Sequence, residues 1–193
     1  MELADDIAAV FAELNETSRS AEALLSAYSA SQLLGRHPGG WSAAQCLEHL
    51  AKTNLLYSNA MRDAVKAAVH LARHERRGPI RPGWFARKFI ERMEAGSTSK
   101  FRAPDSIVPA PEADPRIAMR EFLSAQRALI NLLTEAQGLD LNAIRFKNPF
   151  VPWLRFSVGA GFKVVAAHNR RHIEQARRTA DSIPRAFVAS SGR

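Results

Sequence analysis

The sequence predicts an all-α fold, a four-helix bundle in which one long connection joins the second and third helices. Three observations indicate this class. Apolar residues recur at the three- and four-residue spacing of a helix face in four long segments, and most prolines and glycines lie between those segments. No segment alternates apolar and polar residues for long enough to require a sheet. Four amphipathic helices bury their apolar faces by packing against one another, which makes a bundle.

The first two helices are expected over residues 3–34 and from about residue 41 to residue 73. A set of apolar residues at helical spacing defines the first helix: Ile7, Val10, Phe11, Leu14, Leu24, Leu25 and Tyr28. Three glycines and a proline in residues 35–40 end it. The second helix begins with a strong signature, because Ser42 follows Trp41 and Gln45 comes three residues later. This pattern is a capping box with an apolar residue in the staple position.

Two further long helices follow an extended connection. Residues 74–115 hold six of the ten prolines, and a short helix is expected within them over residues 84–94. The third long helix starts near Pro115, a residue suited to the first helical turn, and ends at Gly138. Residues 139–156 form a second loop, and the last helix runs over residues 157–182.

Length and composition indicate one domain over residues 1–193, because no part of the chain differs in character from the rest. No run of residues approaches the roughly 18 apolar positions of a membrane-spanning helix, so no membrane partner is expected. The first residues are acidic, unlike the basic start of a secretory signal, and the single cysteine, Cys46, cannot form an internal disulfide. These observations favour a cytoplasmic location.

The net charge of +8 and the sequence pI near 10.4 raise the question of an anionic partner, either nucleic acid or a small acidic substrate. The basic residues are spread over several segments, without interleaved aromatic residues or a recognisable DNA-reading motif. Exposed helix faces explain this distribution better than a nucleic-acid surface does. Arginines of the basic segment 73–92, or near Arg155, could instead line the mouth of a substrate site; the role of this segment stays open.

Two histidines of the last helix, His168 and His172, lie four residues apart, which is about 40° around the helix axis. They therefore share a face. The same arc holds the small residues Gly161 and Ala176, which leave room for a ligand, whereas the arginines of residues 170–178 lie on the opposite face.

The second helix carries a third inward histidine, His49. Apolar residues surround it on one arc of the helix, and charged residues occupy the other arc. Three inward histidines in a bundle can be accommodated in two ways. Each can satisfy its own hydrogen bonds, or together they can bind a metal ion through neutral imidazole nitrogens. Spacing alone does not choose between these outcomes.

Other candidate ligands are weaker. Cys46, one turn before the histidine of the second helix, could be a fourth ligand, but a single buried cysteine is more often a small apolar residue of the core. Glu48 points about 100° away from that histidine. The remaining histidines, His37, His70 and His74, fit surface or helix-end roles. Paired carboxylates for glycoside hydrolysis, a glycine-rich phosphate loop and a nucleophilic serine motif are absent from the sequence.

Two stretches of the chain resemble the DinB-like superfamily, which is named for a DNA-damage-inducible protein and includes bacterial thiol-dependent S-transferases. Residues 40–50, Gly-Trp-Ser-Ala-Ala-Gln-Cys-Leu-Glu-His-Leu, are similar to the family's tryptophan-serine helix start that leads to a histidine. Residues 168–176, His-Asn-Arg-Arg-His-Ile-Glu-Gln-Ala, are similar to its closing helix with two histidines. The order of the elements fits over nearly the whole chain, including the long connection.

The resemblance implies an up-down-down-up four-helix bundle. It also implies a divalent metal ion, often zinc or nickel, bound by His49, His168 and His172. Characterised relatives use the metal to activate a low-molecular-weight thiol, such as bacillithiol or mycothiol, for transfer or isomerisation. Three protein ligands leave at least one coordination position open, which is the arrangement of catalytic zinc sites.

These inferences favour a metal-dependent enzyme, a thiol-dependent S-transferase or a hydrolase, that acts on a small molecule. Two alternatives stay open. The first is a non-catalytic metal-binding or stress-response bundle, in which the histidines only stabilise the fold. The second is a nucleic-acid-binding protein, which would show a steep dependence of affinity on salt. A homodimer formed through exposed helix faces is compatible with the sequence.

Overall fold

A computed structural model describes residues 4–70, 75–94 and 103–185 of the chain. Its elements, in chain order, are α1 (Asp5–Ala27), α2 (Ala30–Leu34), α3 (Ala43–His70), α4 (Trp84–Met93), the 3₁₀ helix η1 (Asp105–Ile107), α5 (Pro115–Ala136), β1 (Arg145–Lys147), β2 (Arg155–Ser157) and α6 (Val158–Ser182). The predicted all-α class is confirmed, because the four long helices α1, α3, α5 and α6 make up most of the described chain.

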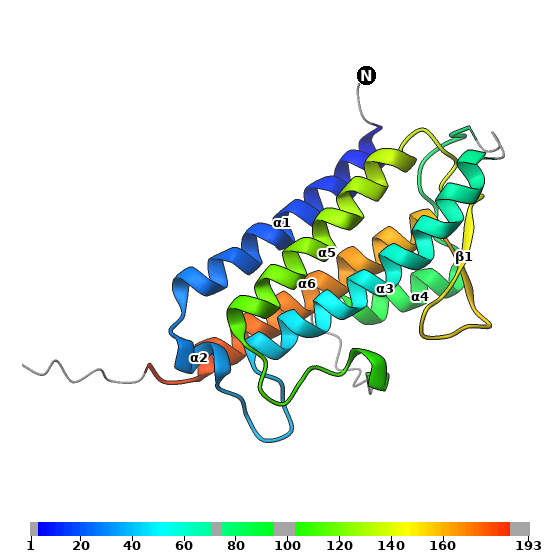
Figure 1. Cartoon of the computed structure of the whole chain (residues 1–193). Helices are drawn as coiled ribbons and strands as arrows, with labels where there is room; N and C mark the ends of the chain where they lie inside the picture. The colour runs from blue at the N-terminus through cyan, green and yellow to red at the C-terminus, as the bar shows by residue number, and fades with distance from the viewer. Residues whose placement is uncertain (1–3, 71–74, 95–102, 186–193) are drawn as a thin grey trace, which may run out of the picture.

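The four long helices form a bundle (Figure 1). α1 and α6 run in one direction, and α3 and α5 run in the other, which is the expected up-down-down-up arrangement (Figure 1). α3 packs against both α5 and α6, and α1 contacts the same two helices from the other side. The long connection carries α4, which packs on the outside of α6. None of the helices in the described ranges is long and apolar enough to cross a membrane.

The expectation of one continuous helix over residues 3–34 was wrong. The helix ends just before Tyr28, and a capping box starts α2. The Gln32 backbone N–H donates to the Ser29 hydroxyl, and the Ser29 backbone N–H donates to the Gln32 side-chain oxygen. The Gln32 amide also donates to the Ala180 and Ile183 carbonyls at the end of α6. The break is therefore stabilised by a local cap and by the carboxyl end of the last helix.

The predicted second loop contains a small hairpin, which the sequence analysis did not predict. β1 and β2 pair antiparallel, with Phe146 opposite Phe156 and both side chains buried. Three-residue strands are too short to show alternation in the sequence. The hairpin also corrects the role given to Gly161. A side chain there would meet Met61 and Phe146 at 2.6–2.8 Å, so the glycine makes room for core packing rather than for a ligand.

Two sets of buried apolar residues fill the bundle along its length. The core nearer the hairpin includes Tyr57, Leu129 and Phe162, and the core nearer α2 includes Leu47, Phe122 and Ala176. α3 ends at His70, and the expected extension to residue 73 lies outside the described residues, as does His74.

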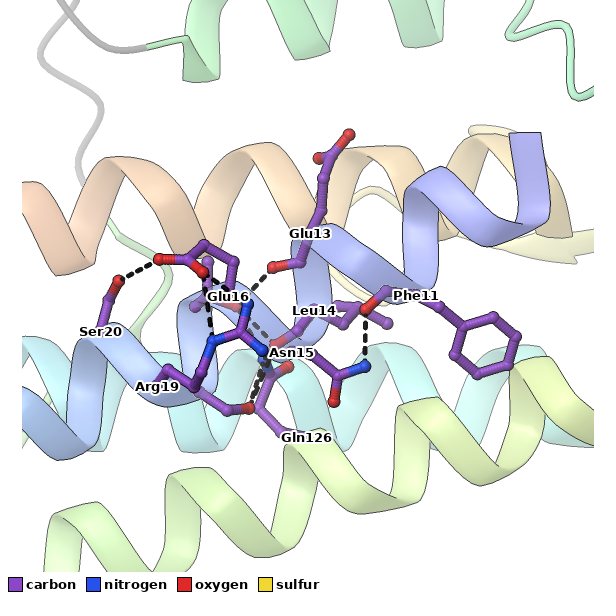
Figure 2. A network of polar contacts seen from close by, with 10 residues as sticks. Phe11, Glu13, Leu14, Asn15, Glu16, Arg19, Ser20 and Gln126 are labelled. Atoms are coloured by element: carbon purple, nitrogen blue, oxygen red, sulfur yellow. Dashed lines mark hydrogen bonds and ion pairs between the residues drawn. The ribbon is translucent and has the colours of Figure 1, made fainter. Parts of the chain in front are cut away.

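Gln126 of α5 joins three other helices through the middle of the bundle, where its side chain is buried. Its amide nitrogen donates to the Leu14 carbonyl of α1 at 2.9 Å (Figure 2). It also donates to Thr17 Oγ1 of α1, at 2.9 Å. Its oxygen accepts from Asn54 of α3 at 3.2 Å and from Asn169 of α6 at 2.9 Å. One side chain thus supplies hydrogen bonds to α1, α3 and α6, in a region where water cannot replace them.

Replacing Gln126 with alanine should lower the free energy of unfolding by about 3 kcal/mol, because it leaves several buried polar groups without a partner. Urea denaturation followed by circular dichroism measures this change. The exposed neighbour Arg127→Ala is the matched control and should change the free energy by less than about 0.5 kcal/mol. Equal effects of the two substitutions would contradict the role given to the buried amide.

Candidate metal centre

The structure brings His49, His168 and His172 together. His49 lies in the second turn of α3, and the other two lie one turn apart on α6, which packs antiparallel to α3 (Figure 1). One nitrogen atom of each ring lies within 4.8 Å of a nitrogen of each of the others. The ring centroids are 4.5 Å apart for His168 and His172, and 4.7 Å apart for His49 and His172. Among the described residues, only these three form such a group.

The segment before α5 holds His49 in one orientation. Its Nδ1 lies 2.8 Å from the Ile107 carbonyl, to which an N–H at this position donates. The Gln45 amide donates to the Ala110 carbonyl at 2.9 Å, and Lys52 donates to the Val108 carbonyl at 2.9 Å. Side chains from the first turns of α3 therefore hold this segment in place by hydrogen bonds. The segment in turn fixes the tautomer of His49.

This tautomer leaves a lone pair on His49 Nε2, which lies 3.2 Å from His168 Nε2. Tetrahedral zinc holds imidazole nitrogens at about 2.0–2.1 Å, so two of its ligand nitrogens lie about 3.3 Å apart. The observed separation matches this spacing, and it is also that of a hydrogen bond between the two rings. A backbone carbonyl that accepts from the second nitrogen of a ligand histidine is also a common partner in metal sites, because it orients the ring.

The other two histidines carry buried nitrogens without partners. His168 Nδ1 and His172 Nδ1 are shielded from solvent, and neither has a hydrogen-bond partner in the described part of the chain. Hydrogen bonds within the described residues therefore leave both rings incompletely satisfied, which is uncommon for buried polar groups. Because nitrogens of the three rings also converge within 4.8 Å, the donor set fits a cation that binds neutral imidazoles through the nitrogens that face one another.

The environment keeps all three rings neutral. Burial lowers the pKa of His49, whose side chain is almost inaccessible to solvent. Burial lowers the pKa of His168 well below its ordinary value, and the neighbouring histidines lower it further. Burial also lowers the pKa of His172, to about 3, with a smaller contribution from His49 and from Arg171. Neutral imidazole is the form that binds metal ions, so these rings are ready to act as ligands at neutral pH.

Trp41 covers one side of the cluster, a role that the sequence analysis did not predict. Its ring centroid lies 4.6 Å from that of His49 and 5.9 Å from that of His172. The predicted capping box is confirmed, because the Ser42 hydroxyl accepts from the Gln45 backbone and the Gln45 side chain accepts from Ser42. The cap directs the chain so that Trp41, the residue before it, lies beside His49, eight residues later, and His172 of α6.

Comparison with protein families decides the relationship that these features suggest. A family model described as the DinB superfamily matches residues 13–176, which include the capping box and all three histidines. The chain belongs to the DinB superfamily. No curated protein matches the chain, and no solved structure matches it. Membership in the DinB superfamily thus rests on the family model, and the bundle agrees with it.

The remaining candidate ligands of this DinB-superfamily chain lie outside the cluster. Cys46 is part of the apolar core near α2, and burial raises the pKa of its thiol to about 12. Glu48 pairs with Lys52 at 2.7 Å and accepts from the Ala110 backbone. His37 lies 2.8 Å from the Ser182 hydroxyl at the end of α6. The expectations that Cys46 fills the core and that Glu48 points elsewhere agree with these positions.

The arginine near the histidines is not the one that the sequence suggested. Arg155 lies before the first residue of α6, and ten helical residues, about 15 Å, separate Val158 from His168. Arg171 is closer, since it directly precedes His172 in α6, and its charge helps to lower the pKa of both His168 and His172. Arg171 donates to the Arg92 carbonyl at 2.8 Å, so the end of α4 is held beside this part of α6.

Without metal, the protein should lose stability as the pH falls below about 6.5, the pKa of histidine in an unfolded chain. The three histidines have lowered pKa values in the fold. Between the folded and unfolded pKa values the unfolded chain therefore binds more protons, and acid favours unfolding. Each histidine contributes up to about 1.4 kcal/mol per pH unit in this range.

Urea denaturation of metal-free protein at several pH values between neutrality and mild acid measures this slope. The variant His168→Leu should show a shallower slope, because it removes one of the three groups. The variant His37→Leu is a surface control and should keep the slope of the unmodified chain. A free energy of unfolding that does not change with pH would show that the histidines are not held neutral.

Proposed function

We propose that His49, His168 and His172 bind one divalent metal ion, zinc or nickel, and that the protein is a metal-dependent transferase or hydrolase of small molecules. The observation that carries the proposal is the convergence of three largely buried imidazoles, each with a ring nitrogen within 4.8 Å of the others. Membership in the DinB superfamily supports it, because its characterised members place a metal at one histidine of the second helix and two of the fourth.

The three ligands leave room for a reacting group. A metal ion held by three protein ligands keeps an open position and lowers the pKa of a water or thiol that binds there. His172 is partly exposed, so the cluster opens to solvent on its side, whereas Trp41 forms an apolar wall. Arg171 adds positive charge close to the cluster, which would favour an anionic cosubstrate. A low-molecular-weight thiol that carries a carboxylate fits these features.

Other parts of the proposal concern the whole protein. We propose a cytoplasmic protein that acts as one domain over residues 1–193, with a role in bacterial stress response. A non-catalytic bundle, in which the metal only stabilises the fold, is the alternative that the experiments below separate from an enzyme.

Protein purified without added metal should carry about one divalent ion per chain. The variants His49→Ala and His168→Ala should each lose it. Mutation of a residue that only supports a ligand lowers metal affinity by roughly 10- to 100-fold, and removal of the ligand itself should lower it further. Elemental analysis measures the content, and His37→Ala, a histidine outside the cluster, should keep the ion. If all three variants and the unmodified chain lack metal, and zinc does not bind on reconstitution, the proposed site is wrong.

Metal-loaded protein should accelerate the reaction of a low-molecular-weight thiol with a small electrophile, and His168→Ala should lower kcat/KM by about 100-fold or more. Mass spectrometry of the product distinguishes the two activities, since a transferase adds the thiol and a hydrolase adds water. A loaded protein that binds metal tightly but turns over neither class of substrate would favour the non-catalytic bundle.

A further inference from the structure

A second candidate site lies at the other end of the bundle, away from the histidines. A pocket of about 160 Å³ opens between the start of α4, the hairpin and the first turn of α6. Three arginines line it, Arg81, Arg145 and Arg155, together with the aromatic residues Trp84 and Phe85. The pocket brings together segments that are far apart in the sequence, including the basic segment 73–92, whose role the sequence left open.

The arginines of this pocket have no acidic partner within the part of the chain that the structure describes. Eight ion pairs occur in the described residues, and none of them includes Arg81, Arg145 or Arg155. Arg145 instead donates to the Arg155 carbonyl at 3.1 Å, which leaves both positive charges uncompensated. Three arginines that line one small pocket concentrate positive charge there. This concentration of charge favours the binding of a multiply charged anion.

The start of α4 adds hydrogen-bond donors at the same place. Its cap residue is Gly83, which has no side chain to accept from the first turn, and the first intrahelical bond runs from the Arg87 N–H to the Gly83 carbonyl. The N–H groups of Trp84, Phe85 and Ala86 thus precede the first intrahelical donor, and all three residues line the pocket. The positive end of a ten-residue helix supports the arginines in binding an anion.

The aromatic residues of the pocket indicate that the ligand has a flat or apolar part as well as a negative charge. Trp84 is 58% exposed and Phe85 is 64% exposed, although both are large apolar side chains. Their rings contact each other edge to face, with centroids 4.9 Å apart. Exposed aromatic residues beside a charged pocket are suited to stacking against a flat apolar group. The space is small, since a water molecule occupies about 30 Å³ in the liquid, so only a compact group fits inside.

We propose that this pocket binds the phosphate group of a small phosphate monoester whose flat or apolar part lies against Trp84 and Phe85. A phosphate monoester carries a charge of about −1.5 to −2 at neutral pH and presents three acceptor oxygens, which matches three guanidinium groups better than a carboxylate or a phosphodiester does. The site is separate from the histidine cluster and does not depend on bound metal. It gives Arg81 and the start of α4 a role in ligand recognition.

Calorimetric titration of the full chain with phenyl phosphate tests the proposal. The protein is first stripped of metal and dialysed, so that phosphate cannot bind through an ion at the histidines. We expect saturable binding that is weaker by about tenfold or more in Arg81→Ala and Arg155→Ala, the loss expected for one hydrogen bond to a charged group. The variant Arg127→Ala, which removes the same charge from the exposed face of α5, should change the affinity by less than about twofold.

Two further measurements separate this pocket from other anion sites. Dimethyl phosphate, a diester, should bind at least about tenfold more weakly than phenyl phosphate. Phe85→Ala should lower the affinity for phenyl phosphate but leave the affinity for inorganic phosphate unchanged, because only phenyl phosphate has a ring that can stack. Thermal unfolding checks that each variant keeps the stability of the unmodified chain.

Three results would overturn the proposal: absence of binding to the unmodified chain, an equal loss in Arg127→Ala and Arg155→Ala, or no preference for the monoester over the diester. A DNA duplex that binds more tightly than phenyl phosphate, with a steep loss of affinity in salt, would assign the arginines to nucleic acid and would also contradict it. None of these results depends on whether the histidines bind metal.

Discussion

The antiparallel packing of α3 against α6 is the constraint on which the candidate metal centre depends. It places the second turn of α3 opposite the middle of α6, so that His49 meets His168 and His172. Each of these residues alone would be a buried polar side chain with a desolvation cost. Together they form a donor set in which one ring is oriented by the Ile107 carbonyl and two buried nitrogens have no partner among the residues described.

A second polar layer supports this packing without taking part in the site. Gln126 accepts from Asn54 and Asn169, which belong to the same two helices as the histidines. Asn169 directly follows His168, so the hydrogen bond that holds this asparagine also limits rotation of α6 at the cluster. Buried networks of this kind restrict a bundle to one arrangement, because a shifted helix would leave several polar groups without partners. The geometry of the histidines thus depends on contacts outside the site.

The histidine cluster and the pocket at the hairpin differ in their electrostatic character. At the cluster, burial keeps the histidines neutral, which suits the binding of a cation. At the hairpin, exposed arginines without acidic partners in the described ranges line a pocket, which suits the binding of an anion. α6 runs between the two, with its first turn at the pocket and its middle at the histidines. Part of the high positive charge of the chain is therefore concentrated at this pocket, and the rest lies on exposed helix faces.

The sequence by itself determined the class of the fold, the start of α3 and the inward face of each histidine, because helical periodicity and capping are local properties that a short window of residues expresses. Only the tertiary structure decided what these faces meet. The hairpin around Phe146 and the position of Trp41 depend on partners far along the chain, such as the core residue Met61 and the histidines. The break before Ser29 depends on both, because a local capping box and the end of α6 stabilise it. The position of Arg155 could have been read from the sequence, because the predicted last helix starts two residues after it and helical rise puts His168 about 15 Å further along.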